Sequence, residues 1–201
     1  MILRCMTDGI KPLLNKTLLL AALTSTEAFA TGTDEHDINP NVKVSENFID
    51  TFYSFNKVQL ETALISAQSS IPSIVFYQGW AEGGNYKIVK RSPCTAKKPN
   101  LISCPITVQD DPMLALKIDF NVTDTFDISF TEGKISSVET SSNDLDVYYA
   151  ARKWVENNYS ELIEEPCQEN KAGGPTPGDC VRAMVKGYAL FAASKDFPVP
   201  D

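Results

Sequence analysis

The single histidine of this chain limits the acid–base chemistry that the protein can perform. Among 201 residues only His36 is a histidine, and it lies in the stretch TGTDEHDINPNVKV, which carries few large apolar side chains. We predict that this stretch is a flexible tail, because it has little apolar surface to pack against a core. A solvated tail histidine cannot activate a serine or cysteine nucleophile in a folded site. Mechanisms that need a catalytic histidine are therefore excluded.

A carboxylate can still act as an acid or a base, and Asp124 has the position for it. The apolar side chains between positions 114 and 130 fall on even numbers, and Asp124 interrupts that series between Val122 and Phe126. Alternation with period two is typical of a strand with one buried face, so Asp124 could point into the cavity, although a turn position is the interpretation that we favour. Burial raises the pKa of a carboxyl group and makes it a usable base or neutral donor near pH 7. The simpler alternative is that Asp124 lies in a turn between two strands.

Aromatic side chains are concentrated upstream of this aspartate and could line a pocket for an apolar ligand. A phenol or indole supplies a large apolar surface together with one polar group. The alternative is that these rings pack the core between helices and sheet. The residues predicted to bind a ligand, including the aspartate, are Tyr53, Tyr77, Trp80, Tyr86, Asp124 and Phe126.

The first thirty residues have the three parts of a secretory signal peptide. Arg4, Lys11 and Lys16 make the start basic, LLLAAL follows at 18–23, and Ala28-Phe29-Ala30 has the small-x-small form that a signal peptidase cleaves. The apolar run is far shorter than the roughly 20 residues that span a bilayer. We therefore expect an exported protein, periplasmic or extracellular, with a flexible tail at 31–45 and no stable membrane insertion after cleavage.

Export exposes cysteines to oxidation, and four cysteines follow the leader. Of the three pairings that four cysteines allow, we favour the two local ones, Cys94–Cys104 and Cys167–Cys180. Each closes a loop rich in Pro, Lys, Gly or Asn, and each cross-link is expected to contribute about 3 kcal/mol by restricting the unfolded chain. A zinc site is the rejected alternative, because the chain lacks paired C-x-x-C spacing and its histidine lies in the tail.

Composition and motifs narrow the range of partners. The formal charge of −8 argues against nucleic acid, whose phosphates need clustered Lys and Arg, and against anionic lipid surfaces. The stretch GWAEGGNY lacks the G-x-G-x-x-G spacing of a phosphate-binding loop. We therefore expect no cofactor, no metal and no nucleic acid, and a small-molecule ligand is the expected partner.

Periodicity predicts helices, then antiparallel strands, then helices, an order typical of an α+β fold with a curved sheet packed on helices. Ser45 is the predicted N-cap of the first helix, Pro105 indicates an edge strand or a bulge, and Gly133 supplies a hairpin turn. Residues 110–122 are ambiguous between a strand and a short helix that starts at Asp110-Asp111-Pro112. Asp179 is the predicted cap of the last helix. The expected helices cover 46–67, 70–82, 145–163 and 179–195, and the expected strands cover 86–91, 102–109 and a hairpin from about 123.

The hairpin FDISFTEGKI at 126–135 resembles the NTF2-like (SnoaL-like, cystatin-like α+β cone) superfamily, in which an aromatic strand often precedes an acid-Gly-basic-Ile turn. Similar features are ISCPIT at 102–107, Leu114-Ala115-Leu116 and the helix that carries Trp154. The resemblance covers 46–165, with 166–201 as a C-terminal helical extension held by a disulfide. It implies a conical sheet that encloses a pocket closed by helices. Members include isomerases, dehydratases, cyclases, hydrolases and binding modules, so the fold fixes no reaction.

Three functions follow from these observations. The first is a non-catalytic module that binds a small apolar molecule in the cone pocket or acts as an accessory protein. The second is a cofactor-independent isomerase or lyase that uses a buried aspartate and tyrosine. The third is a protein–protein interaction module, including a homodimer formed through the sheet.

Overall fold

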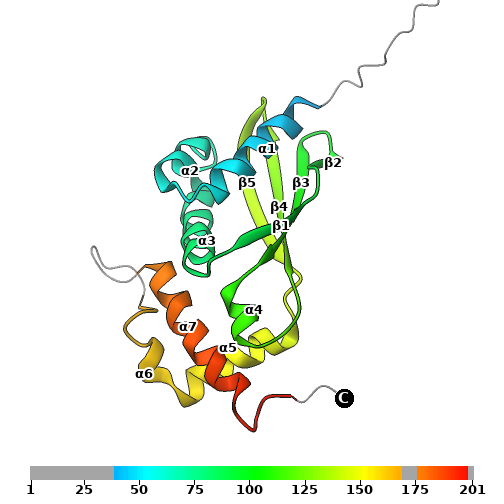
Figure 1. Cartoon of the computed structure of the whole chain (residues 1–201). Coiled ribbons are helices and arrows are strands. Elements are labelled where there is room, and N and C mark those ends of the chain that lie inside the picture. Colours follow the sequence, from blue (N-terminus) through cyan, green and yellow to red (C-terminus); the bar gives the residue numbers. More distant parts are fainter. Residues whose placement is uncertain (1–38, 169–175, 199–201) are drawn as a thin grey trace, which may run out of the picture. The chain divides into compact units, whose positions relative to one another are not determined.

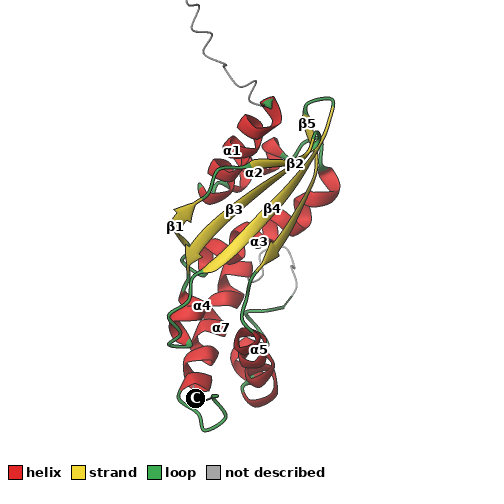
Figure 2. Cartoon of the chain, turned by 90° about the vertical axis from the view of Figure 1, so that its right-hand side faces the viewer, coloured by secondary structure: helices red, strands yellow, loops and turns green. Residues whose placement is uncertain are grey.

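Three N-terminal α-helices cover one face of a curved antiparallel sheet, and four further α-helices lie at one end of it (Figures 1 and 2). The computed structural model describes residues 39–168 and 176–198. The predicted signal peptide, Cys5 and His36 lie outside the described residues. The helices are α1 (Pro40–Tyr53), α2 (Lys57–Ala63), η1 (Gln68–Ser70), α3 (Ile71–Gly83), α4 (Asp111–Ala115), α5 (Asp146–Asn158), α6 (Ser160–Ile163) and α7 (Pro177–Ala192); the strands are β1 (Lys87–Arg91), β2 (Thr95–Lys98), β3 (Leu101–Gln109), β4 (Val122–Thr131) and β5 (Lys134–Ser142).

The sheet has the order β1-β3-β4-β5, and β2 also pairs with β3. A two-residue turn joins β4 to β5, and both of its residues have positive φ, 52° at Glu132 and 73° at Gly133. Such turns match the right-handed twist of the strands that they connect. The α+β class and the central hairpin predicted from the sequence are therefore confirmed.

Pro105 lies in the interior strand β3 and not on an edge. Its carbonyl accepts a hydrogen bond from the Ser92 N–H at 3.3 Å, so its nitrogen faces the same side, toward β1 and β2. The β1 pairing ends at Ile106 and the β2 pairing begins at Ser103. The missing N–H of Pro105 therefore falls in the gap between the two short strands, where no ladder hydrogen bond is lost.

The first helix begins earlier than its sequence predicts. Asn39 is the N-cap, its side chain accepts from the Asn41 N–H, and Pro40 occupies the first turn. Ser45, the predicted cap, is buried inside the helix and donates its hydroxyl hydrogen bond to the Asn41 carbonyl at 2.9 Å. Residues 40–45 are thus helical, and the predicted tail at 31–45 does not extend this far. The hydropathy pattern does not indicate this first turn, because Asn39 and Ser45 stabilise it through side-chain hydrogen bonds to the helix backbone and not through apolar contacts.

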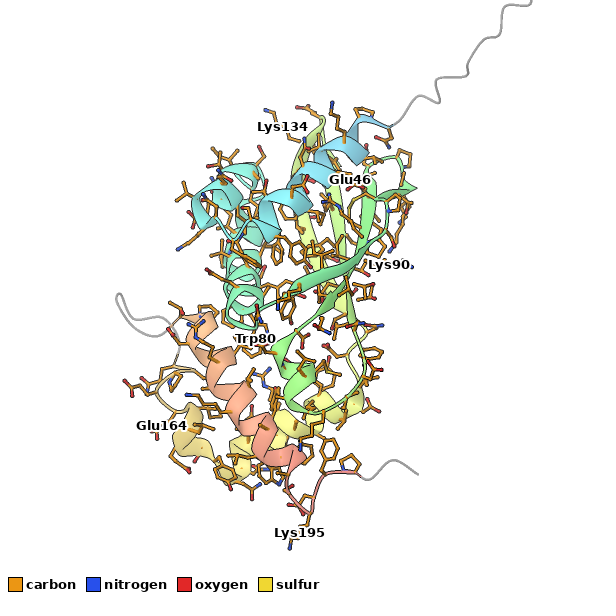
Figure 3. All side chains as sticks on the ribbon, viewed as in Figure 1. Glu46, Trp80, Lys90, Lys134, Glu164 and Lys195 are labelled. Atoms are coloured by element: carbon orange, nitrogen blue, oxygen red, sulfur yellow. A yellow bond between two sulfur atoms is a disulfide. The ribbon has the colours of Figure 1, made fainter. Side chains whose placement is uncertain are left out.

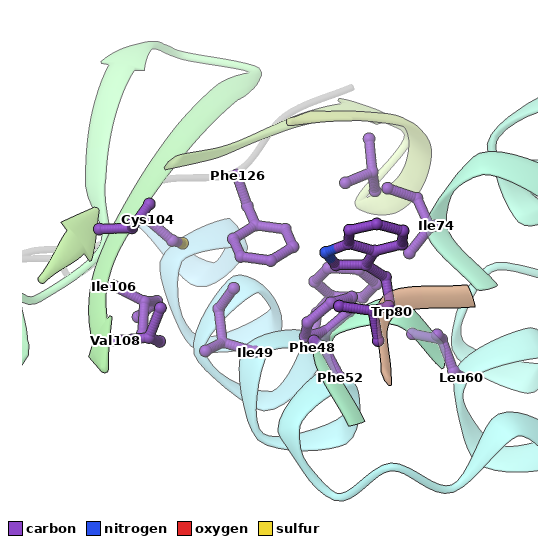
Figure 4. Close-up of a cluster of buried hydrophobic side chains, with 14 of the residues drawn as sticks. Phe48, Ile49, Phe52, Leu60, Ile74, Trp80, Cys104, Ile106, Val108 and Phe126 are labelled. Carbon is purple, nitrogen blue, oxygen red and sulfur yellow. The ribbon is translucent and has the colours of Figure 1, made fainter. Parts of the chain in front are cut away.

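The core lies between α1, α3 and the inner face of the sheet (Figure 4). Phe48 and Phe52 of α1 lie edge-on to Phe126 of β4, with ring centroids 6.2 and 4.8 Å apart. The Gln78 side chain of α3 donates to the Phe52 carbonyl at 2.8 Å and so joins the end of α1 to α3. This contact holds α1 and α3 together next to Tyr53, the last residue of α1, and Tyr77 of α3.

The ambiguous segment before β4 contains a short helix. The Asp110 side chain accepts from the Met113 N–H at 2.7 Å and caps α4, and β4 begins only at Val122. Of the two sequence interpretations, the helix start at Asp110-Asp111-Pro112 is therefore correct, and the even-numbered series reflects a strand only in its second half.

Both predicted disulfides are present, Cys94–Cys104 and Cys167–Cys180. The first holds the segment between β1 and β2 against β3, and the second ties the segment after α6 to α7. Asp179 is not the N-cap of α7: Thr176 is the cap, and Asp179 lies three residues later and completes a capping box with it. None of the described helices is long and apolar enough to cross a membrane.

Helix α7 approaches α3 closely at two glycines. A Cβ added at Gly83 would lie 2.2 Å from the Gly178 Cα, whereas a Cβ at Gly79 would lie 3.4 Å from the Pro177 side chain. The first distance is impossible without moving a helix backbone, and the second is close to ordinary contact.

We expect Gly83→Ala to lower the free energy of unfolding by about 2 to 4 kcal/mol, because overpacking against backbone forces the two helices apart. Gly79→Ala is the control, since it adds the same methyl group to the same helix where only the Pro177 side chain lies nearby. Urea denaturation measures both variants. Equal stability of the two variants would contradict the close packing of α3 on α7.

Candidate functional site

Asp124 lies in the interior of the sheet, on the inner face of β4, with only 1% of its surface exposed. It is paired in register with Ile106 of β3 and Ser142 of β5. The pattern of alternating buried residues along β4 places it on the same face as Val122 and Phe126. The sequence interpretation of an inward-pointing residue is therefore correct, and the alternative of a turn residue is wrong.

Neither carboxyl oxygen of Asp124 has a hydrogen-bond partner among the described residues. The hydroxyls of Tyr53 and Tyr77 lie near enough to stabilise its charged form by weak hydrogen bonding, but neither makes a well-formed hydrogen bond to it, and the buried Tyr53 hydroxyl has no other partner among the described residues. Most buried polar groups in proteins are hydrogen-bonded, and an unpaired one costs stability. This group of unsatisfied atoms is therefore a feature that packing alone does not explain.

Burial raises the pKa of Asp124 to about 7; the Tyr77 and Tyr53 hydroxyls lower it in part, and the charges of Asp144 and Asp110 raise it further. The same burial raises the pKa of Asp110 to about 6, against the opposing effect of its bond from the Met113 N–H. Two carboxyl groups of this region therefore change charge near neutral pH.

The tyrosines around Asp124 stay protonated throughout that range. Burial is the main cause that raises the pKa of Tyr53, Tyr77 and Tyr86 above the ordinary tyrosine value, and the negative charge of Asp124 adds to it at each ring. The three residues come from the end of α1, from α3 and from the segment just before β1. Neutral phenols can donate hydrogen bonds but carry no charge to balance the carboxylate.

A pocket of about 790 Å³ extends from Asp124 between α3, β5, α5 and α7. Aromatic side chains form much of its wall, and Figure 3 shows Trp80 at the end of α3 nearest to α7. Phe76 and Trp80 are stacked with ring centroids 6.4 Å apart, and Tyr77 lies 6.5 Å from Tyr86. The aromatic residues of the wall are Phe76, Tyr77, Trp80, Tyr86 and Tyr148.

The six residues predicted to bind a ligand lie in one region, although not all of them reach the pocket. Tyr77, Trp80, Tyr86 and Asp124 line it. Tyr53 and Phe126 are packed behind it, with ring centroids 6.4 Å apart. The two alternatives for the aromatic residues both apply, because Phe126 packs the core while Trp80 faces the pocket.

The wall supplied by the C-terminal helices was missed from the sequence. Tyr148, Arg152 and Glu156 of α5 line the pocket, and Arg152 donates to the Glu156 carboxylate at 3.2 Å. Their spacing of four residues places all three on one face of α5, which is a pattern visible in the sequence. Nothing in the sequence, however, indicated that this face would line the same pocket as α3.

No group of His, Cys, Asp and Glu side chains within 39–168 and 176–198 could hold a metal ion. Comparisons with protein-family models, with curated proteins and with solved structures find no match. Proposals for function therefore depend on the geometry of the site.

The raised pKa of Asp124 predicts how stability changes with pH. Between the unfolded value near 3.9 and the folded value of about 7, the folded state binds more protons, so stability falls as pH rises. We expect wild type to lose up to about 4 kcal/mol relative to Asp124→Asn between pH 4 and pH 8.

Denaturation curves at several pH values measure this difference. Asp119→Asn is the control, because Asp119 is exposed and its substitution removes the same charge. Asp110 is present in both proteins, so the difference between them reports Asp124 together with its coupling to Asp110. Parallel stability profiles for wild type and Asp124→Asn would contradict the raised pKa of Asp124.

Proposed function

We propose that this protein is an exported binding protein that takes a small molecule with a large apolar part into the pocket beside Asp124. The observation that carries the proposal is a carboxylate with two unsatisfied oxygens at a pocket with an aromatic wall. Ligand pockets are typically apolar and contain a few polar groups that fix orientation. A ligand that donates to Asp124 would satisfy atoms that the chain itself leaves without partners.

Two further parts of the proposal concern fold family and location. Helices packed on a curved antiparallel sheet, with a pocket between them, support membership of the NTF2-like superfamily. The basic and apolar leader and the two disulfides support export to the periplasm or the extracellular space.

Filling the pocket tests the binding function. Thr140 lines the pocket from β5, while its neighbour Glu139 points to the opposite face of the same strand. We expect Thr140→Trp to abolish binding of aromatic fragments and Glu139→Trp to leave it unchanged. Ligand-observed NMR with a set of neutral, cationic and anionic aromatic fragments measures this. The proposal fails if no fragment binds, or if the fragments bind Thr140→Trp as well as they bind wild type.

A second candidate function is a cofactor-independent isomerase, favoured by a base with pKa about 7 beside neutral phenols. Ionised Asp124 would remove a proton from carbon next to a carbonyl, and the electron pair of that C–H bond would form an enolate. The phenol hydroxyl of Tyr77, which lines the pocket, would stabilise the enolate oxygen, and Asp124 would return the proton to a different carbon.

Exchange of solvent deuterium into 3-cyclohexen-1-one tests this candidate. We expect exchange to rise with pH through about 7, because the base is the ionised form of Asp124. Asp124→Asn should lower the rate at least about 100-fold, in the range typical of a lost general base. Equal exchange rates in the two proteins, or no exchange above the buffer rate, would contradict catalysis and leave the binding function standing.

A further inference from the structure

The charges that line the pocket are unbalanced. Among the described residues, the charged side chains of its lining are the acids Asp124, Asp144 and Glu156 and one cation, Arg152. Arg152 is already paired with Glu156 at 3.2 Å on the same helix. Asp144 accepts hydrogen bonds from the hydroxyls of Ser142 and Tyr149. These hydroxyls are neutral, so two negative charges at the pocket have no positive partner among the described residues.

From this imbalance and the aromatic wall, we infer that the pocket selects an organic cation, an amine or ammonium group joined to an apolar body, with its positive group at Asp124. This inference rests on the proposed binding function and names the class of its ligand. An ammonium group supplies three N–H donors and the missing positive charge, whereas the Asp124 carboxylate offers two unpaired acceptors.

The aromatic side chains fit the same ligand class. A cation is attracted to the face of an aromatic ring when it lies within about 6 Å of the ring centre, and Trp and Tyr are the strongest partners. Trp80, Tyr77, Tyr86 and Tyr148 surround the pocket from three different parts of the chain. An anionic ligand would be repelled, because it would add negative charge beside Asp124 and Asp144, which have no positive partner among the described residues. A neutral alcohol could donate to Asp124 but would leave its charge uncompensated.

The inference is tested with three probes that differ only in their polar group. These are 4-phenylbutylamine, 4-phenyl-1-butanol and 4-phenylbutyrate, titrated by calorimetry at pH 8. We expect the amine to bind at least about tenfold more tightly than the alcohol, as a charge-assisted hydrogen bond in a buried site requires, and the carboxylate to bind most weakly. Asp124→Asn should remove the advantage of the amine over the alcohol, while Asp119→Asn should keep it.

Binding should also depend on pH in a way that identifies Asp124. The ionisable groups facing Asp124 are Tyr53 from α1, Tyr77 from α3, Tyr86 before β1, Asp110 before α4 and Asp144 after β5. The tyrosines do not titrate below pH 8, and Asp110 and Asp144 are retained in Asp124→Asn. Amine affinity should therefore fall below pH 7 more steeply in wild type than in Asp124→Asn.

The outcomes separate this inference from the proposed function. Equal affinity for amine and alcohol, or tightest binding of the carboxylate, overturns the cationic ligand while pocket binding stands. An unchanged preference for the amine in Asp124→Asn overturns the role of Asp124. If none of the three probes binds wild type, the cationic ligand class is refuted, and the fragment experiment with Thr140→Trp decides separately whether the pocket binds anything.

Discussion

A buried carboxylate without a hydrogen-bond partner is the constraint around which this structure is organised. An isolated charge in an apolar interior is unfavourable by several kcal/mol, and a protein ordinarily avoids it by pairing the group or replacing it. Asp124 is surrounded instead by phenols that make no well-formed hydrogen bond to it and by Asp110 and Asp144, whose charges make its ionisation harder. A residue kept only for packing would not need a carboxyl group here, because leucine or asparagine would avoid the charge.

The position of Asp124 follows from the register of the sheet, which is fixed on both sides of β4. The turn at Glu132 and Gly133, together with a one-residue shift of register between Phe130 and Ser129, sets how β5 pairs with β4, and β3 pairs with β4 without interruption from Leu101 to Val108. A shift of one residue would turn Asp124 to the outer face and bring Thr125 and Asp127 inward. That shift is unfavourable, because it would expose Phe126 and the other apolar side chains on the inner face of β4. Their burial therefore keeps Asp124 on the inner face, although a buried charge is itself unfavourable.

The sequence could predict what depends on local pattern. The period of two along β4 indicated the inward direction of Asp124, and the turn residues indicated the hairpin. It also indicated both disulfides, because each closes a short loop. The sequence could not predict that Pro105 lies in an interior strand, since the gap between β1 and β2 exists only in the folded sheet. Nor could it predict that α7 packs on α3, because the Gly83–Gly178 approach joins segments almost one hundred residues apart.

The C-terminal helices decide whether Asp124 lies in a core or beside a pocket. Without α5 and α7, the end of α3 that carries the buried Trp80 would be exposed to solvent, and water could reach the carboxylate region. Helix α7 packs against α3 through glycines, and the Cys167–Cys180 bond ties the segment after α6 to it. The low dielectric environment around Asp124 is therefore built from two distant parts of the chain. Because electrostatic attraction is stronger where water is excluded, the same helices that make the bare charge unfavourable would strengthen its attraction for a ligand of opposite charge.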